Sequence, residues 1–272
     1  MDLMLRLTGL LVICYSALLL WIYFNQQGML YFPNQFRPSP EQAQVRNLQL
    51  WPGSDDEYRG LLINPEQASA TAIVFHGNAG TAWDRRFYAL ALSRLNYRVI
   101  LVEYPGYGGR SGKPSETTII ADALDTIELA RQQFPGPVTL WGESLGAAVA
   151  AASTEFQPDD ARKNAITAVV MITPWYSLPE LAQALYWYLP ARRLTREQYN
   201  NMHSLANFKG RTALLIATED EIIPNRQSLQ LYDALHTTKK LWTFDGADHN
   251  SWPTSPDNAW WSEVDHFIKG SE

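Results

Sequence analysis

The fold is decided by the stretch Pro137-Val138-Thr139-Leu140-Trp141-Gly142-Glu143-Ser144-Leu145-Gly146, which an alanine-rich run at 147–152 follows. An apolar strand, a G-x-S-x-G turn and a helix of small residues are the context in which this motif forms a nucleophile elbow. In so sharp a turn the serine is strained, and side chains at positions 142 and 146 would collide with neighbouring strands. The pattern predicts that Ser144 stands exposed above a sheet, at a helix N-terminus that favours negative charge.

Strand-like and helix-like runs alternate through the rest of the chain. We expect strands at 58–63, 71–75, 98–103, 137–141, 165–172, 212–217 and 240–244, with helices that include 115–134 and 256–269. Strands as apolar as 72–75 and 168–172 fit a parallel sheet that is buried on both faces. The predicted fold class is therefore α/β, with a mostly parallel central sheet flanked by helices.

A serine hydroxyl is a poor nucleophile unless a base takes its proton, so the motif requires a histidine and an acid. Asp220 follows the predicted strand at 212–217, and His249 follows the one at 240–244. Because the carboxyl ends of parallel strands meet at one edge of a sheet, both are expected near Ser144, in the chain order Ser, Asp, His. We assign Asp220 as the orienting acid and His249 as the general base.

Other acids and histidines compete for these roles. Glu219, Glu221 and Asp248 are the rival carboxylates, and we interpret them as solvated loop acids. The remaining histidines, none of which directly follows a predicted strand downstream of Ser144, are His76, His203, His236 and His266.

Negative charge that develops on an attacked carbonyl oxygen needs aimed donors. The predicted strand at 71–75 ends in His76-Gly77-Asn78-Ala79-Gly80, where glycines let the backbone approach a ligand closely. We expect the backbone N–H groups of Asn78 and Leu145 to form the oxyanion hole.

Composition excludes several other classes of function. The chain has 272 residues, and its formal net charge of -6 argues against an electrostatic nucleic-acid binder. One cysteine, Cys14, cannot form an intramolecular disulfide, and the five histidines lack metal-ligand spacing, so no metal is expected. The run 106–113 lacks the spacing of a phosphate loop or a dinucleotide fingerprint, so no cofactor is expected either.

The N-terminal segment 7–24 carries no charge, and as a helix it would be about 27 Å long, just short of the hydrocarbon thickness of a bilayer. Trp21 and Tyr23 lie at its distal end, where an aromatic belt would place them. No small-x-small site closes the apolar run, which favours an uncleaved single-pass anchor at 1–24 over a cleaved signal peptide. Arg6 precedes the segment, and Arg37 alone follows within 20 residues, which favours an exported catalytic domain. A polar connector is expected at 25–44, and the soluble domain at 45–272.

The chain resembles the α/β-hydrolase superfamily, and within it the membrane-anchored serine hydrolases. The motifs that carry this resemblance cover nearly the whole chain and occur in order: the N-terminal apolar segment, Tyr31-Phe32-Pro33, His76-Gly77-Asn78-Ala79-Gly80, Gly106-Tyr107-Gly108, the G-x-S-x-G turn, the step from Asp220 to Pro224, and His249-Asn250. One departure is Arg110, where the family's GYG loop more often has serine. In the resembled fold, the insertion at 173–209 forms a small helical cap over the active site. Four of its aromatic side chains are expected to line an apolar acyl channel: Trp175, Tyr186, Trp187 and Tyr188.

The sequence therefore predicts a membrane-anchored serine hydrolase that cleaves small-molecule or lipid carboxylic esters through an acyl-enzyme on Ser144. A thioesterase and a peptidase are the alternatives within hydrolysis. A membrane-tethered binding scaffold without turnover is the alternative from another class, and it would be favoured by a degenerate triad.

Overall fold

A computed structural model describes residues 2–53, 57–155 and 166–270. Within these ranges, the main sheet has eight strands, in the order β10-β9-β8-β7-β4-β6-β3-β2. Neighbouring strands from β10 to β6 run parallel, whereas β3 is antiparallel to both β6 and β2. Their bounds are β2 Gln49–Trp51, β3 Gly60–Ile63, β4 Ala70–Phe75, β6 Tyr97–Val102, β7 Val138–Glu143, β8 Ile166–Ile172, β9 Arg211–Ala217 and β10 Thr238–Phe244. The predicted α/β class with a mostly parallel sheet is confirmed.

Each predicted strand corresponds to an observed one, with ends that differ by at most two residues. Ala165, where one predicted strand was expected to begin, lies outside the described residues. Three short strands have no counterpart in the prediction: β2, β1 (Phe32–Pro33) and β5 (Ala79–Gly80). β1 and β5 pair with each other in a separate parallel ladder. β1 and β5 have two residues each, which is too short for an alternating pattern of hydrophobicity to predict them.

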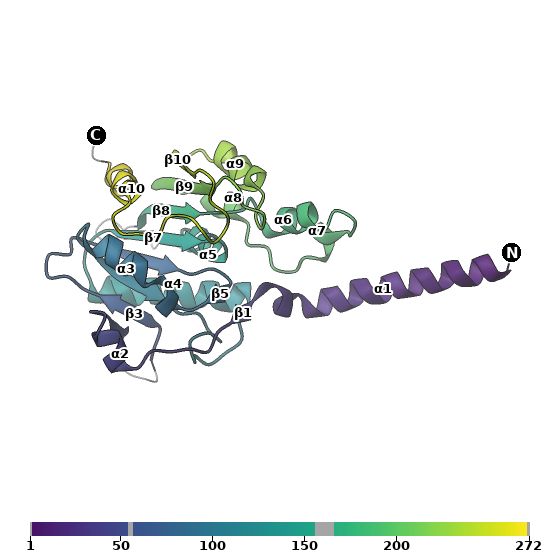
Figure 1. Ribbon diagram of the computed structural model, residues 1–272, viewed down its shortest axis with the longest axis horizontal. Helices are drawn as coiled ribbons and strands as arrows, with labels where there is room; N and C mark the ends of the chain where they lie inside the picture. Colours follow the sequence, from purple (N-terminus) through teal and green to yellow (C-terminus); the bar gives the residue numbers. More distant parts are fainter. Residues whose placement is uncertain (1, 54–56, 156–165, 271–272) are drawn as a thin grey trace.

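Helices cover both faces of the sheet (Figure 1). Against one face lie α4 (Glu116–Gln133), α5 (Leu145–Ala152) and α9 (Asn225–Ala234), which contribute Ile119, Val149 and Leu231 to one buried cluster. The other face carries α2, η1, α3 and α10, with the bounds Pro40–Gln44, Ala82–Arg85, Arg86–Ser93 and Ala259–Lys269. Two separate apolar layers therefore sandwich the sheet, as buried parallel strands require.

Most of the tryptophan side chains belong to these layers. Trp141 of β7 and Trp261 of α10 have ring centroids 5.9 Å apart, and Tyr88 of α3 packs 5.4 Å from Trp261. Aromatic pairs at such distances contribute about 0.5–1.5 kcal/mol each beyond the area they bury. Of the ten tryptophans, only Trp21 and Trp187 are more than half exposed.

The N-terminal helix α1 (Asp2–Leu30) projects from the rest of the molecule (Figure 1). None of its residues is buried, and it is long and apolar enough to cross a membrane, a property that an anchor and a signal sequence share. The helix continues to Leu30, so the first six residues of the predicted connector are helical.

The insertion after β8 forms three short helices: α6 (Leu178–Leu185), α7 (Ala191–Leu194) and α8 (Asn201–Leu205). α6 and α7 contact each other and lie beside the C-terminal half of α1 (Figure 1). α8 packs on α5 and α9. We call α6, α7 and the turn between them the cap.

The end of α1 is bound to the last residue of the cap and to the chain that follows it. The Gln26 side chain donates to the Leu194 carbonyl (2.8 Å) and accepts from the Arg196 N–H (2.9 Å). The Tyr31 hydroxyl lies 3.1 Å from Glu197 Oε2 and 2.9 Å from the Tyr199 hydroxyl. Burial raises the pKa of Tyr31 well above its ordinary value, so the phenol stays protonated. The orientation of α1 relative to the cap is therefore fixed by side chains.

Candidate active site

Ser144 occupies the sharp turn between β7 and α5. Its φ of 52° and ψ of -115° lie in a region that a residue with a side chain rarely adopts. Such strain persists only where the surrounding structure imposes it, and it is concentrated at functional sites. The predicted elbow conformation is therefore present at this serine.

The two glycines of the motif are needed for close packing. A Cβ at Gly146 would lie 2.0 Å from the Phe75 carbonyl oxygen of β4. A Cβ at Gly142 would lie 2.1 Å from the Gly146 carbonyl oxygen. The expectation that both positions face neighbouring strands is thus right for Gly146 and wrong for Gly142, which faces the backbone of α5.

Asp220 and His249 come together at the end of β9 and β10. His249 Nδ1 lies 2.7 Å from Asp220 Oδ2. The other carboxylate oxygen of Asp220 accepts the backbone N–H groups of Ile222 (2.9 Å) and Ile223 (2.7 Å). Asp220 is 9% exposed, so these bonds hold one orientation of a nearly buried carboxylate. The arrangement leaves His249 Nε2 on the opposite side of the ring.

The rival carboxylates have other surroundings. Glu219 and Glu221 are exposed on the same loop. Asp248 Oδ1 accepts the backbone N–H of Asn250 at 2.7 Å, which lowers the pKa of Asp248. The structure gives none of the three a hydrogen bond to His249, so Asp220 remains the acid best placed to orient it.

A cavity of about 720 Å³ opens above the elbow. Ser144, His249 and Asn78 all line it, together with Trp175 and Tyr186 of the predicted substrate-binding set. Among the described residues, Ser144 makes no direct hydrogen bond to His249. Contacts of this kind are often long in enzymes without substrate. The cavity wall nevertheless brings the predicted nucleophile and base to one space.

The cap residues Trp187 and Tyr188 lie elsewhere. α6 ends at Leu185, and the turn after it carries these two side chains outward, where they are 79% and 60% exposed. Tyr188 lines a different cavity, and Trp187 lines neither. The expectation that both line the channel above Ser144 is corrected: of the four aromatics, Trp175 and Tyr186 do.

The predicted oxyanion donors face no acceptor within the described part of the chain. Leu145 is the first residue of α5, where a backbone N–H has no partner in its own helix. The Asn78 carbonyl accepts the Phe32 N–H (3.0 Å) and the Tyr107 hydroxyl (2.8 Å), while its side chain donates to the Leu30 carbonyl (2.9 Å). These contacts fix the Asn78 peptide and leave its N–H for a ligand.

Sequence reasoning missed an ion pair in the wall of this cavity. Glu143, directly before Ser144, is paired with Arg85 of η1, and both line the cavity. Glu143 Oε1 also accepts the Gly77 N–H at 3.3 Å. The pair thus links the elbow to the loop that carries Asn78. The only sequence signal for this ion pair is the glutamate inside the G-x-S-x-G motif, because Arg85 lies 58 residues away from Glu143.

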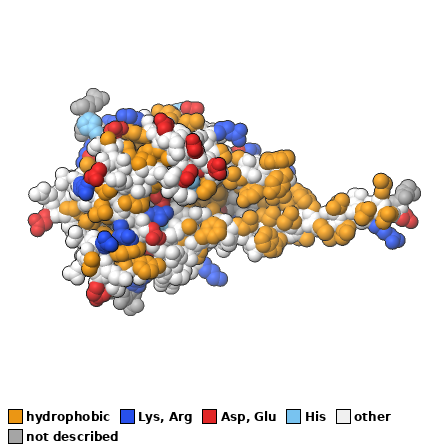
Figure 2. Space-filling view, viewed as in Figure 1, with side chains coloured by type: hydrophobic (Ala, Val, Ile, Leu, Met, Phe, Trp, Pro, Cys, Tyr) orange, Lys and Arg blue, Asp and Glu red, His pale blue; other side chains and the backbone are white. Residues whose placement is uncertain are grey.

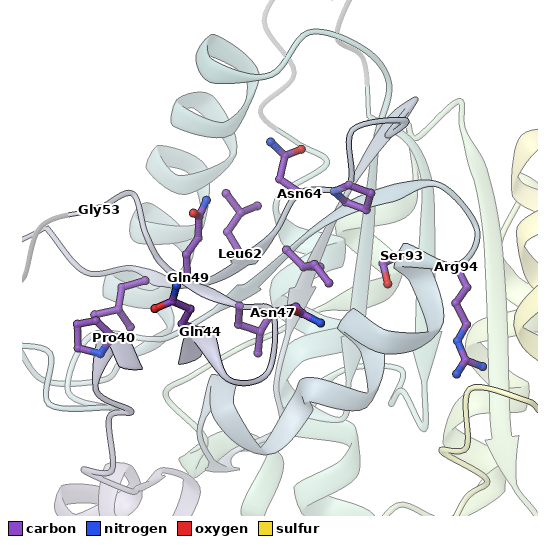
Figure 3. Close-up of a pocket in the computed structure, with 13 residues that line it drawn as sticks. Pro40, Gln44, Asn47, Gln49, Gly53, Leu62, Asn64, Ser93 and Arg94 are labelled. Atoms are coloured by element: carbon purple, nitrogen blue, oxygen red, sulfur yellow. The ribbon is translucent and has the colours of Figure 1, made fainter. Parts of the chain in front are cut away.

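A larger hollow, of about 1210 Å³, lies elsewhere on the molecule (Figure 3). It is lined by residues such as Gln44, Asn64 and Arg94 and includes none of the predicted site residues. Because it holds no nucleophile beside a base, the smaller cavity at Ser144 is the candidate active site.

The family model described as alpha/beta hydrolase matches residues 72–262, and the chain belongs to this family. An uncharacterized protein of Mycobacterium tuberculosis is 30% identical over 248 residues, which cover 86% of this chain and 84% of that protein. Lysophosphatidylserine lipase ABHD12 of Danio rerio is 29% identical over 192 residues, 64% of this chain and 50% of that protein. A Pyrococcus furiosus esterase structure superposes with a TM-score of 0.68 at 17% identity, covering 89% and 99% of the two chains. The α/β-hydrolase fold is thereby confirmed.

We predict that Arg85→Met lowers the free energy of unfolding by about 3 kcal/mol, because it leaves the nearly buried Glu143 carboxylate unpaired. Adding Glu143→Gln should recover part of that loss, since the glutamine keeps an acceptor for Gly77 without a charge. Urea unfolding of the full-length protein in detergent measures the two steps. If the double variant lost as much unfolding free energy as the two single variants together, the coupling between Arg85 and Glu143 would be contradicted.

Proposed function

We propose that this protein is a serine hydrolase that cleaves carboxylic esters through an acyl-enzyme on Ser144. The observation that carries the proposal is the 2.7 Å contact between His249 and Asp220 beside a cavity that Ser144 and His249 share. A nucleophile, an acid and a base in this chain order and at one sheet edge are the parts that such chemistry requires.

The proposed reaction begins when Ser144 Oγ attacks the ester carbonyl and His249 Nε2 takes its proton. Asp220 holds the Nδ1 proton of His249 and stabilises the imidazolium. The N–H groups of Asn78 and Leu145 stabilise the negative oxygen of the tetrahedral intermediate. The alcohol then leaves with the proton from His249. Water, activated by the same histidine, releases the acid and restores Ser144.

The cavity walls support an ester with an apolar acyl group. Leu178, Leu181 and Leu185 of α6 line the cavity opposite the elbow. A relative named as a lysophosphatidylserine lipase and a structural neighbour named as an esterase favour ester substrates over the thioester and peptide alternatives. The Asp220–His249 contact argues against the binding scaffold, for which no such contact would be needed.

We further propose that α1 is an uncleaved single-pass anchor. Its apolar surface is not buried by the protein, which leaves a bilayer as the environment that would cover it. Gln26 binds the chain after the cap, and Met29 and Leu30 line the active-site cavity, so the end of α1 belongs to the globular part. The proposed orientation has the catalytic domain on the exported side.

The first test is covalent labelling. Wild-type protein treated with a fluorophosphonate probe should gain one adduct on Ser144, because among the serines that the structure describes this one alone lies in an elbow and lines a cavity with His249. Ser144→Ala should abolish the adduct, as detected by intact mass. Persistent labelling of the mutant would overturn the proposed nucleophile.

The second test separates the acids. Asp220→Asn should lower kcat/KM for a short reporter ester by roughly 10⁴-fold, by analogy with amide replacements in serine protease triads. Asp248→Asn, on the neighbouring loop, is the matched control and should change kcat/KM by less than about tenfold. If Asp248→Asn were the crippling change, the proposed acid would be wrong.

The third test concerns α1. Full-length protein should pellet with membranes, resist carbonate extraction and be released by detergent, because a charge-free helix is costly to expose to water. Intact-mass analysis should find the mature chain starting at Met1 or Asp2. A mature chain that starts beyond residue 24 would replace the anchor with a signal peptide.

A further inference from the structure

A second cavity, of about 340 Å³, lies between α1 and the cap. Leu18, Trp21 and Ile22 of α1 form one wall, and Tyr188, Leu189 and Leu194 form the other. We call this cavity the anchor–cap groove. It is mostly apolar, although Gln26 and Glu197 also line it.

The anchor–cap groove shares its inner wall with the active-site cavity. The residues that line both are Met29, Leu30, Leu178, Ala182 and Tyr186. Leu18 and Leu30 lie twelve residues apart on α1, or about 18 Å along the helix axis. The two cavities are therefore adjacent: one is lined by Leu18 in the apolar part of α1, and the other is lined by Ser144.

The outer end of the groove lies where the proposed anchor would leave the bilayer. Trp21 is 57% exposed on α1, and Trp187 is 79% exposed on the cap turn. The Arg196 guanidinium lies 5.3 Å from the centre of the Tyr23 ring. Exposed tryptophan and tyrosine beside arginine are typical of the membrane–water interface. Figure 2 shows hydrophobic surface continuing from α1 onto the adjoining globular part, around a hollow.

We propose that the anchor–cap groove is the path by which an acyl chain passes from the bilayer to Ser144, so that the substrate is a membrane-resident, long-chain carboxylic ester. This inference rests on the proposed function, because it assigns the substrate of that same site. An acyl chain that follows the groove exchanges lipid for protein walls without crossing water, so its apolar surface need never be hydrated. A short, water-soluble ester reaches Ser144 without using the outer part of the groove.

The test compares two esters of one fluorogenic alcohol, a butyrate in water and an oleate partitioned into the bilayer. Full-length protein is reconstituted in phosphatidylcholine nanodiscs, and kcat/KM is measured for each ester. The readout is the ratio of the oleate value to the butyrate value.

The first pair of variants changes the α1 wall. Leu18→Trp adds bulk to the groove, and Leu11→Trp makes the same change seven residues earlier, on nearly the same face of α1 but outside the groove. Leu18→Trp should lower the ratio by about tenfold or more, as if the contacts of roughly two buried methylenes were lost. Leu11→Trp should leave the ratio within about twofold of wild type.

The second pair tests the opposite wall and does not depend on how α1 inserts. Leu194→Trp fills the groove from the cap side, whereas Leu229→Trp makes the same change on α9, away from both cavities. Leu194→Trp should lower the ratio as Leu18→Trp does, and Leu229→Trp should not. Thermal unfolding in the same nanodiscs verifies that each variant is folded.

Ser144→Ala distinguishes the two ways in which the inference can fail. If wild type hydrolyses both esters through Ser144 but neither groove variant lowers the ratio, the proposed path is wrong and the proposed function stands. Hydrolysis of butyrate alone would overturn the path in the same way. If Ser144→Ala hydrolyses both esters as fast as wild type, the proposed function is wrong, and the path with it.

Discussion

The contact between α5 and β4 determines how the catalytic edge is built. A Cβ at residue 146 would lie 2.0 Å from the Phe75 carbonyl oxygen, so the helix can approach the strand this closely only without a side chain there. The approach brings the first residue of α5, Leu145, next to the loop that follows β4. Asn78 lies in that loop, so the absence of a side chain at residue 146 determines the positions of both proposed oxyanion donors. The strained φ of Ser144 follows from the same turn, because the chain must reverse between a buried strand and a helix pressed against its neighbour.

Sequence reasoning located residues correctly where their position follows from the end of a long buried strand. β4, β7, β8 and β9 are mostly apolar and almost entirely buried, so their ends were predictable, and with them the positions of Ser144, Asp220 and Asn78. It failed where a role depends on a contact between distant segments. No periodic pattern in the sequence predicts the Arg85–Glu143 pair or the β1–β5 ladder. The same is true of the hydrogen bonds of Gln26 to Leu194 and Arg196, which lie 168 and 170 positions further along the chain. Trp187 and Tyr188 were misplaced because composition alone does not tell an inward aromatic from an outward one.

The N-terminal helix therefore cannot be treated as a tether that ends where the enzyme begins. Its last turns line the active-site cavity, and the Leu30 carbonyl accepts a hydrogen bond from the side chain of Asn78, a proposed oxyanion donor. The connector residue Phe32 binds the carbonyl of that same asparagine. Truncation that removes these turns together with Phe32 would take away part of the cavity wall and two of the bonds that orient Asn78. The part of the chain that forms the candidate active site thus extends further toward the N-terminus than the 72–262 match to the family model.

The continuity of α1 from Asp2 to Leu30 has a geometric consequence for the whole molecule. Successive residues of an α-helix are rotated by about 100° around its axis. Since Gln26 is held by two hydrogen bonds and no break separates it from Leu18, the rotational phase of the proposed membrane segment is locked to that of the globular body. Inserting one residue between them would turn a different face of the segment toward the cap while barely changing its length. Angular register, in addition to hydrophobic length, is therefore a property that the N-terminal segment must preserve.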